Sequence, residues 1–170
     1  MTHDKKSMDQ AIKETTTRIG KYLTFVLENE EYGIGILKVK EIIGMMPITS
    51  VPRTPPFVQG VINLRGKVIP IMDLRSKFGM GSIPYTERTC IIVVEIDAAD
   101  TTVLIGIVVD AVSEVLNIRA EEIEDTPAFG TKLDTEYIMG MAKMGGGVKI
   151  LLNIDRVLSS AEFQGIQRVV

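Results

Sequence analysis

The chain contains few of the side chains that most often perform chemistry. Its 170 residues include one histidine, one cysteine and no tryptophan. A hydrolytic triad needs a base beside its nucleophile, and His3 lies in a polar N-terminal stretch. A zinc site needs several Cys or His ligands. Cys90 precedes the run Ile91 to Val94, which is typical of a buried strand, and it cannot form an internal disulfide. We therefore expect no catalytic residues, no metal and no cofactor.

Charge and hydropathy exclude two further classes of partner. Nineteen Lys and Arg against 22 Asp and Glu give a net charge of −3, so there is no basic field for nucleic acid. No apolar run approaches the roughly 20 residues that cross a bilayer as a helix. The first ten residues lack the apolar core of a signal peptide. These features predict a cytoplasmic protein that does not insert into membranes directly.

The remaining polar motifs have structural explanations. The acidic group Glu121, Glu122, Glu124 and Asp125 lacks the order of a calcium loop and fits a solvated face. Asp73 stands at the end of an expected strand, where a carboxylate accepts backbone N–H bonds more often than it acts as a catalytic acid.

The chain repeats itself approximately. Gly33 matches Gly106 at an offset of 73 residues (106 − 33), and Gly60 matches Gly140 at an offset of 80 (140 − 60). Matched glycines and apolar positions reflect a shared scaffold, so differences between the copies indicate function. The clearest difference is Arg65, whose counterpart is Gly145.

Short apolar segments separated by glycine turns predict a mainly β protein built from small barrels, because closure removes exposed strand edges. We expect tails at 1–20 and 161–170, a first barrel over about 21–85, a second over about 86–153, and a closing helix over 154–160. A brief helical turn is expected within 37–44, and an apolar layer common to both halves is expected because each half is small. Strands over 60–64 and 67–74 would form a hairpin that exposes Arg65 in its turn.

Three segments carry a resemblance to a known family: EEYGIGILKVKEI at 30–42, TPPFVQGVINLRGKVIPIMDLRSKF at 54–78 and GIVVDAVSEVL at 106–116. Together they resemble the CheW family of bacterial chemotaxis coupling proteins, over about Tyr22 to Leu158. The resemblance implies two intertwined five-stranded β-barrels of the Src-homology-like kind. It also implies a non-catalytic adaptor that joins the cytoplasmic tips of methyl-accepting chemoreceptors to the regulatory domain of the histidine kinase CheA. Such an adaptor is recruited to the inner face of the membrane through receptor arrays.

The resemblance also implies binding positions. Val39, Glu41 and Arg65 match the family's binding-sensitive positions, and Gly60, Val108 and Ala111 are candidates for a groove between the barrels. Gly35 replaces an acidic residue common in the family's pattern, so no charged contact is expected there.

The residues themselves leave alternatives open at these positions. The Arg65 guanidinium could bind a carboxylate of its own chain, such as Glu41, or one of a partner. Glu41 is repeated as Glu114, which also fits a scaffold role, and Val39 and Val108 also fit a core role.

A second function class stays open on sequence alone, namely a small-molecule-binding or enzymatic β-barrel. Such a protein would have a pocket with convergent polar groups and a saturable ligand. The scarcity of histidine and the absence of tryptophan favour the adaptor.

Overall fold

The computed structural model describes residues 19–98, 101–126 and 136–167, and strands dominate these residues, which confirms the predicted mainly β class. The elements in chain order are β1 (Gly20–Leu27), β2 (Glu30–Gly35), the 3₁₀ helix η1 (Ile36–Lys38), β3 (Val39–Gly44), β4 (Val58–Leu64), β5 (Lys67–Asp73), α2 (Leu74–Lys77), β6 (Cys90–Ala98), β7 (Thr101–Val109), β8 (Ala111–Ile118), η2 (Ala120–Glu122), β9 (Ile123–Glu124), β10 (Ile138–Met144), β11 (Gly147–Leu152), η3 (Ile154–Arg156) and α3 (Ser160–Gln167).

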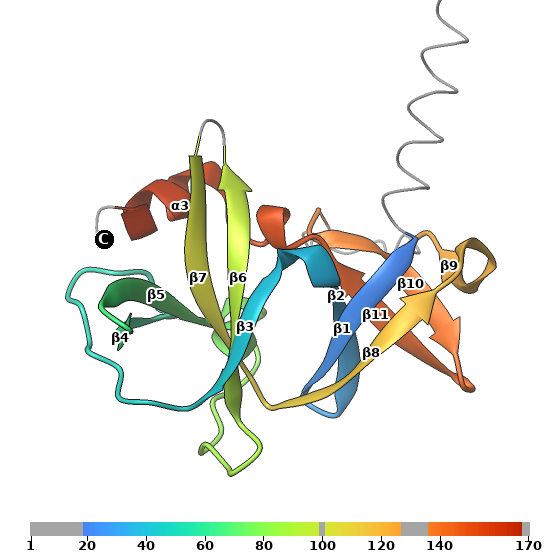
Figure 1. The fold of residues 1–170 in the computed structure, drawn as a ribbon, viewed down its shortest axis with the longest axis horizontal. Helices are drawn as coiled ribbons and strands as arrows, with labels where there is room; N and C mark the ends of the chain where they lie inside the picture. Colours follow the sequence, from blue (N-terminus) through green and yellow to red (C-terminus); the bar gives the residue numbers. More distant parts are fainter. Residues whose placement is uncertain (1–18, 99–100, 127–135, 168–170) are drawn as a thin grey trace, which may run out of the picture.

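The strands form two sheets that lie side by side (Figure 1). One has the order β8-β1-β2-β11-β10-β9 and the other the order β3-β6-β7-β5-β4. In the first, the bent segment β8–η2–β9 pairs with β1 at one end and with β10 at the other. In the second, β3 pairs with β6, and Thr49 further along the chain exchanges two backbone hydrogen bonds of 2.8 and 2.9 Å with Val61 of β4. If each bent segment is counted as one strand, both barrels have five strands.

The two repeats exchange their first hairpins. Strand β5 of the first copy pairs in parallel with β7 of the second, and β11 of the second pairs in parallel with β2 of the first. The six-stranded sheet therefore combines residues 20–35 with 111–152, whereas the five-stranded sheet uses residues 39–109. The expected barrel bounds, 21–85 and 86–153, do not coincide with these sheets. A repeat reveals which segments are alike but not which copies pair, and the observed pairing is the intertwined one that the resemblance implied.

An apolar layer lies between the barrels, in addition to a small core inside each. The central layer takes residues from both sheets, including Phe25, Ile34, Met72, Ile92 and Ile107. Separate clusters fill the five-stranded barrel around Ile71 and Val108 and the six-stranded barrel around Tyr22 and Leu151. Each fully buried side chain of this size contributes about 2–3 kcal/mol. Since the largest cluster belongs to neither barrel alone, the expected shared layer is present.

The chain ends differ from the sequence-based expectation. The predicted closing helix at 154–160 is instead η3 followed by α3, and α3 covers all of the described part, 161–167, of the expected tail at 161–170. It is held because Phe163 and Ile166 are buried in the central layer and Lys77 lies 2.6 Å from Glu162. The helical turn expected within 37–44 is η1 followed by strand β3. The expected N-terminal tail lies outside the described residues up to residue 18.

Candidate functional site

The turn between β4 and β5 presents Arg65 to solvent. Arg65 has φ +51° and Gly66 has φ +86°, and this pair of left-handed residues matches the twist of a two-residue hairpin. Asn63 Oδ1 accepts a 2.8 Å hydrogen bond from the Gly66 N–H. The matching turn uses Gly145 and Gly146, which adopt positive φ without side-chain strain. Arg65 thus occupies a position that glycine fills more easily, and its side chain is 69% exposed, as the hairpin prediction required. The location points to a role for the side chain itself.

Arg65 forms a two-point ion pair with Glu41 of β3. Its Nη1 donates to Glu41 Oε1 at 3.0 Å, and its Nη2 contacts Oε2. These hydrogen bonds hold the pKa of the Glu41 carboxyl below its ordinary value and raise the pKa of Arg65. The pair ties the β4–β5 turn to β3. Because it faces solvent, it contributes little stability. Glu114 repeats Glu41, but Gly145 replaces the arginine, so this pair belongs to one barrel only.

Exposed apolar side chains occur near both partners of the ion pair in the sequence. Ile42, next to Glu41, is 46% exposed, and Val68, just after the turn, is 48% exposed. We call the ion pair, together with the β4–β5 turn that carries Arg65, the Glu41–Arg65 surface. The repeat equivalents of Ile42 and Val68 are Val115 and Val148, each 50% exposed on the other barrel. The same two positions are therefore apolar and exposed on both barrels, and such side chains are available to a partner.

Three of the sequence-predicted binding residues are less exposed than Arg65. Val39 is half-buried against the central layer, and Val108 is 3% exposed inside the five-stranded barrel. Gly60 is buried with φ +143°, and a Cβ there would lie 2.0 Å from the carbonyl oxygen of Thr49. Gly60 and Val108 thus pack within the barrel, whereas Val39 lies on β3 two residues before Glu41.

Ala111, the remaining candidate, lines a cavity of about 480 Å³ between the barrels. We call this cavity the inter-barrel groove. Its walls come from the end of β1 and the β1–β2 turn, the β7–β8 crossover and the connector at 79–89, and include Val26, Asn29, Ile83, Arg88 and Asp110. Ile83 is 43% exposed, and nearby Tyr85 is 48% exposed. Sequence reasoning missed these connector residues, although isolated apolar residues within a Gly- and Pro-containing segment were a usable signal.

A buried arginine fixes the shape of this groove. Arg75 of α2 donates from Nε to the Gly81 carbonyl at 2.9 Å and from Nη1 to Asp110 Oδ2 at 2.8 Å. The same Asp110 oxygen accepts the Glu28 N–H at 2.9 Å. Arg75 therefore connects the connector, the β7–β8 crossover and the β1–β2 turn.

The described residues offer no constellation for metal binding, since no three His, Cys, Asp or Glu side chains gather among them. Asp73 accepts the Arg75 and Ser76 N–H groups at the start of α2, which confirms its predicted structural use. Cys90 lies on β6 and is half-buried, and burial raises the pKa of its thiol. Within the described ranges, every helix is too short or too polar to cross a membrane.

Comparison with known proteins gives a consistent result. Residues 21–162 match the CheW-like domain. A chemotaxis protein CheW of Klebsiella aerogenes is 44% identical over 149 residues, which cover 88% of this chain and 87% of that protein. The CheW of Thermotoga maritima is 31% identical over 156 residues, covering 90% and 93% of the two chains.

A solved structure has the same architecture. The scaffolding protein TtCheW of Thermoanaerobacter tengcongensis superimposes with a TM-score of 0.74 at 36% sequence identity, over 85% of this chain and 95% of that one. The family match covers most of the chain, both barrels included, so the chain belongs to the CheW family of non-catalytic chemotaxis scaffolds.

Proposed function

We propose that the chain couples methyl-accepting chemoreceptors to the histidine kinase CheA, by binding the receptor's cytoplasmic tip and the CheA regulatory domain on separate surfaces. The observation that carries this proposal is the presence of two separate features that can bind a partner, namely the exposed Arg65–Glu41 pair on one barrel and the cavity between the barrels. An adaptor needs at least two contact surfaces.

We assign the Glu41–Arg65 surface to CheA. The exposed side chains of Ile42 and Val68 on the same strands would supply buried area. The ion pair would orient the partner, because a pair desolvated by an interface gains strength that it lacks in water. Only one barrel has this pair, so a partner can distinguish the barrels although their backbones are alike. The second barrel, with Val115 and Val148, offers a further contact of the kind that an extended array requires.

We assign the inter-barrel groove to the receptor. A receptor's helical tip needs a concave surface that accepts apolar side chains at helical spacing. The groove supplies Ile83, Val26 and Ala111 as apolar contacts, and Arg88 and Asp110 as polar neighbours. Its floor is held in shape by the Arg75 bonds, so the site is largely formed before binding. In this arrangement the chain reaches the inner face of the membrane only through its receptors.

Titration calorimetry with a CheA regulatory domain tests the first assignment. Arg65→Ala should weaken binding while the melting temperature stays within a few degrees, because exposed turn substitutions usually change stability by less than about 0.5 kcal/mol. Lys67→Ala, another exposed cation in the same hairpin, is the matched control and should bind like the unchanged chain.

The double reversal Glu41→Arg with Arg65→Glu separates two roles of the pair. If the pair acts by orienting the turn, the double reversal restores binding that either reversal alone removes. If Arg65 instead contacts a carboxylate of CheA, the double reversal stays weak. Undiminished binding and kinase control in Arg65→Ala would remove this residue from the contact surface.

A further inference from the structure

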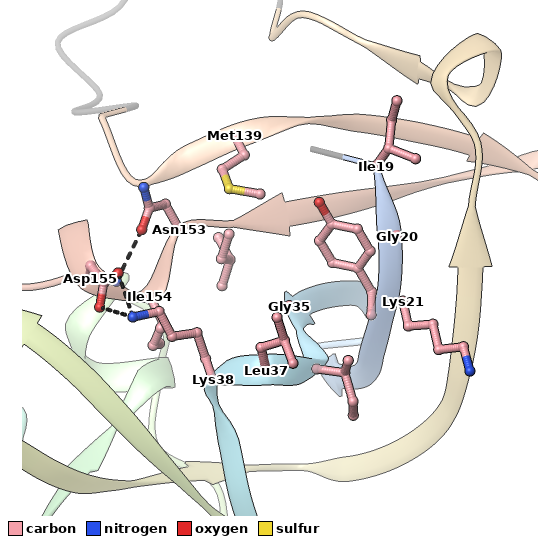
Figure 2. Close-up of a pocket in the computed structure, with 13 residues that line it drawn as sticks. Ile19, Gly20, Lys21, Gly35, Leu37, Lys38, Met139, Asn153, Ile154 and Asp155 are labelled. Atoms are coloured by element: carbon pink, nitrogen blue, oxygen red, sulfur yellow. Dashed lines mark hydrogen bonds and ion pairs between the residues drawn. The ribbon is translucent and has the colours of Figure 1, made fainter. Parts of the chain in front are cut away.

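A second apolar feature lies at the mouth of the six-stranded barrel, distinct from both surfaces assigned above. It is a pocket of about 400 Å³ between the start of β1, η1, β10 and η3 (Figure 2). Its apolar walls are Ile19, Tyr22, Ile36, Met139, Leu152 and Ile154. A cavity of this volume holds a few aliphatic side chains. Its polar lining residues are Lys21, Lys38, Asn153 and Asp155, and Lys38 is already paired with Asp155.

Leu37 stands on the rim of this pocket and is 89% exposed, the most exposed large apolar side chain among the described residues. The repeat places Asp110 at the equivalent position (37 + 73), where it pairs with Arg75. The scaffold therefore accepts a charged residue at this position, and the fold does not require a leucine. The patch therefore combines a projecting leucine side chain with a neighbouring apolar pocket that is large enough to accept such a side chain.

The charges around the pocket are opposite on its two sides. Lys38 lies 2.8 Å from Asp155 and 2.9 Å from Asp97, so one cation meets two carboxylates and this side carries one net negative charge. Asp97 is 61% exposed at its side chain. Lys21 is exposed on the other side of the pocket, as Figure 2 shows.

We propose that this face binds a second copy of the chain through a two-fold symmetric contact, in which Leu37 of each copy enters the pocket of the other. A two-fold contact joins the same patch on both chains, so the patch must be complementary to itself. This patch is complementary to itself, because Leu37 of one copy would enter the pocket of the other and the Lys21 side of one copy would face the Asp97 side of the other. Because the contact centres on one side chain and one pocket in each copy, we expect a weak dimer that forms at high local concentration. The inference does not depend on the proposed function.

Sedimentation velocity of the full chain over a concentration series up to about 1 mM tests this proposal. The unchanged chain should shift from monomer to dimer with rising concentration. Leu37→Asp should raise the dimer Kd at least about 100-fold, because a two-fold interface contains the substitution twice. Lys21→Glu should weaken the dimer less, and the loss should shrink in high salt. Ser113→Asp, which places the same charge at an exposed position on β8 of the same barrel, should leave the dimer unchanged.

Folding of the variants and the location of the contact must be checked alongside the dimer Kd. Melting temperatures of all variants should match the unchanged chain within a few degrees, and Leu37→Gln replaces Leu37→Asp if the latter unfolds. Amide signals near Met139 and Ile19 should shift with concentration in the unchanged chain and stay fixed in Leu37→Asp. A chain that remains monomeric at the highest concentration overturns the proposal, as does a dimer that survives both Leu37 variants. If those variants instead lower receptor binding alone, the pocket belongs to the receptor.

Discussion

Replacing Gly60 with alanine should destabilise the fold through a collision that can be located in the structure. The new Cβ would lie 2.0 Å from the carbonyl oxygen of Thr49. That oxygen accepts the Val61 N–H at 2.9 Å, so it cannot withdraw without breaking the bridge that closes the five-stranded barrel. Loss of the two hydrogen bonds costs about 1–3 kcal/mol. The positive φ of +143° adds about 1–2 kcal/mol for a residue with a side chain.

The sum, about 2–5 kcal/mol, corresponds to a fall in melting temperature of about 4–20 °C for a chain of this size. Thermal unfolding followed by circular dichroism measures it, with two matched controls. Gly66→Ala has a positive φ but open space around its Cβ, and should cost only about 1–2 kcal/mol. Gly44→Ala has neither problem and should be close to neutral. If Gly60→Ala melts together with Gly66→Ala, Thr49 is not held against β4 and the described barrel closure is wrong.

Three further predictions concern the connections between the barrels. Cutting the connector within 79–84 should leave neither fragment with a cooperative thermal unfolding transition, because the hairpin exchange gives each barrel strands from both sides of the cut. A dispersed NMR spectrum from the isolated fragment that begins near Tyr85 would contradict this. Arg75→Ala should lower the free energy of unfolding by about 2–4 kcal/mol in chemical denaturation, since it leaves the partly buried Asp110 carboxylate without its cation. A loss as small as that of Arg65→Ala would show that Arg75 does not hold the three segments together. Burial opposes ionisation of Glu162, but hydrogen bonds from Lys77 and Ser159 outweigh burial and lower the pKa of its carboxyl. The ionised carboxylate therefore stabilises the fold above the ordinary carboxyl pKa, and this stabilisation is lost as pH falls through the lowered pKa. Glu162→Gln should cost less than about 1 kcal/mol of unfolding free energy at neutral pH and nothing near pH ~2, which urea titrations at both pH values would check.

The sequence predicts local hairpins well because their signals are local. The β4–β5 hairpin follows from alternating apolar residues around an Arg-Gly turn, and the structure has it with Arg65 exposed. Strand β3 was mistaken in part for a helical turn, since Val39, Ile42 and Ile43 also fit a helical period. Only the pairing of Ile42 with Ile92 on β6, 50 residues later, decides between the two.

The hairpin exchange could not be derived from the repeat. Parallel pairing of β5 with β7 and of β11 with β2 joins segments from different copies, and nothing within either copy encodes the choice. The intertwined arrangement came from the family resemblance alone. In contrast, α3 had a local signal that was overlooked: Ser159 and Glu162 cap each other's backbone N–H groups at 3.1 and 2.8 Å, the pattern of a capping box.

The candidate site was predictable where the two copies differ. Arg65 stood out because its counterpart is glycine, and its contact with Glu41 was one of two partners expected. Gly60 and Val108 match positions expected from the resemblance, but burial gives both a packing role. The groove residue Ile83 lies in a connector whose position depends on a buried arginine, and no local pattern reveals that dependence.

The central claim is that receptor and kinase bind separate surfaces of one chain. Binding of Arg65→Glu and of Ile83→Asp to a CheA regulatory domain and to a receptor cytoplasmic fragment, measured by calorimetry for all four combinations, tests it most directly. The account predicts that Arg65→Glu loses CheA and keeps the receptor, that Ile83→Asp loses the receptor and keeps CheA, and that both melt like the unchanged chain. Equal loss of both partners in either folded variant, or no loss in any combination, would contradict it.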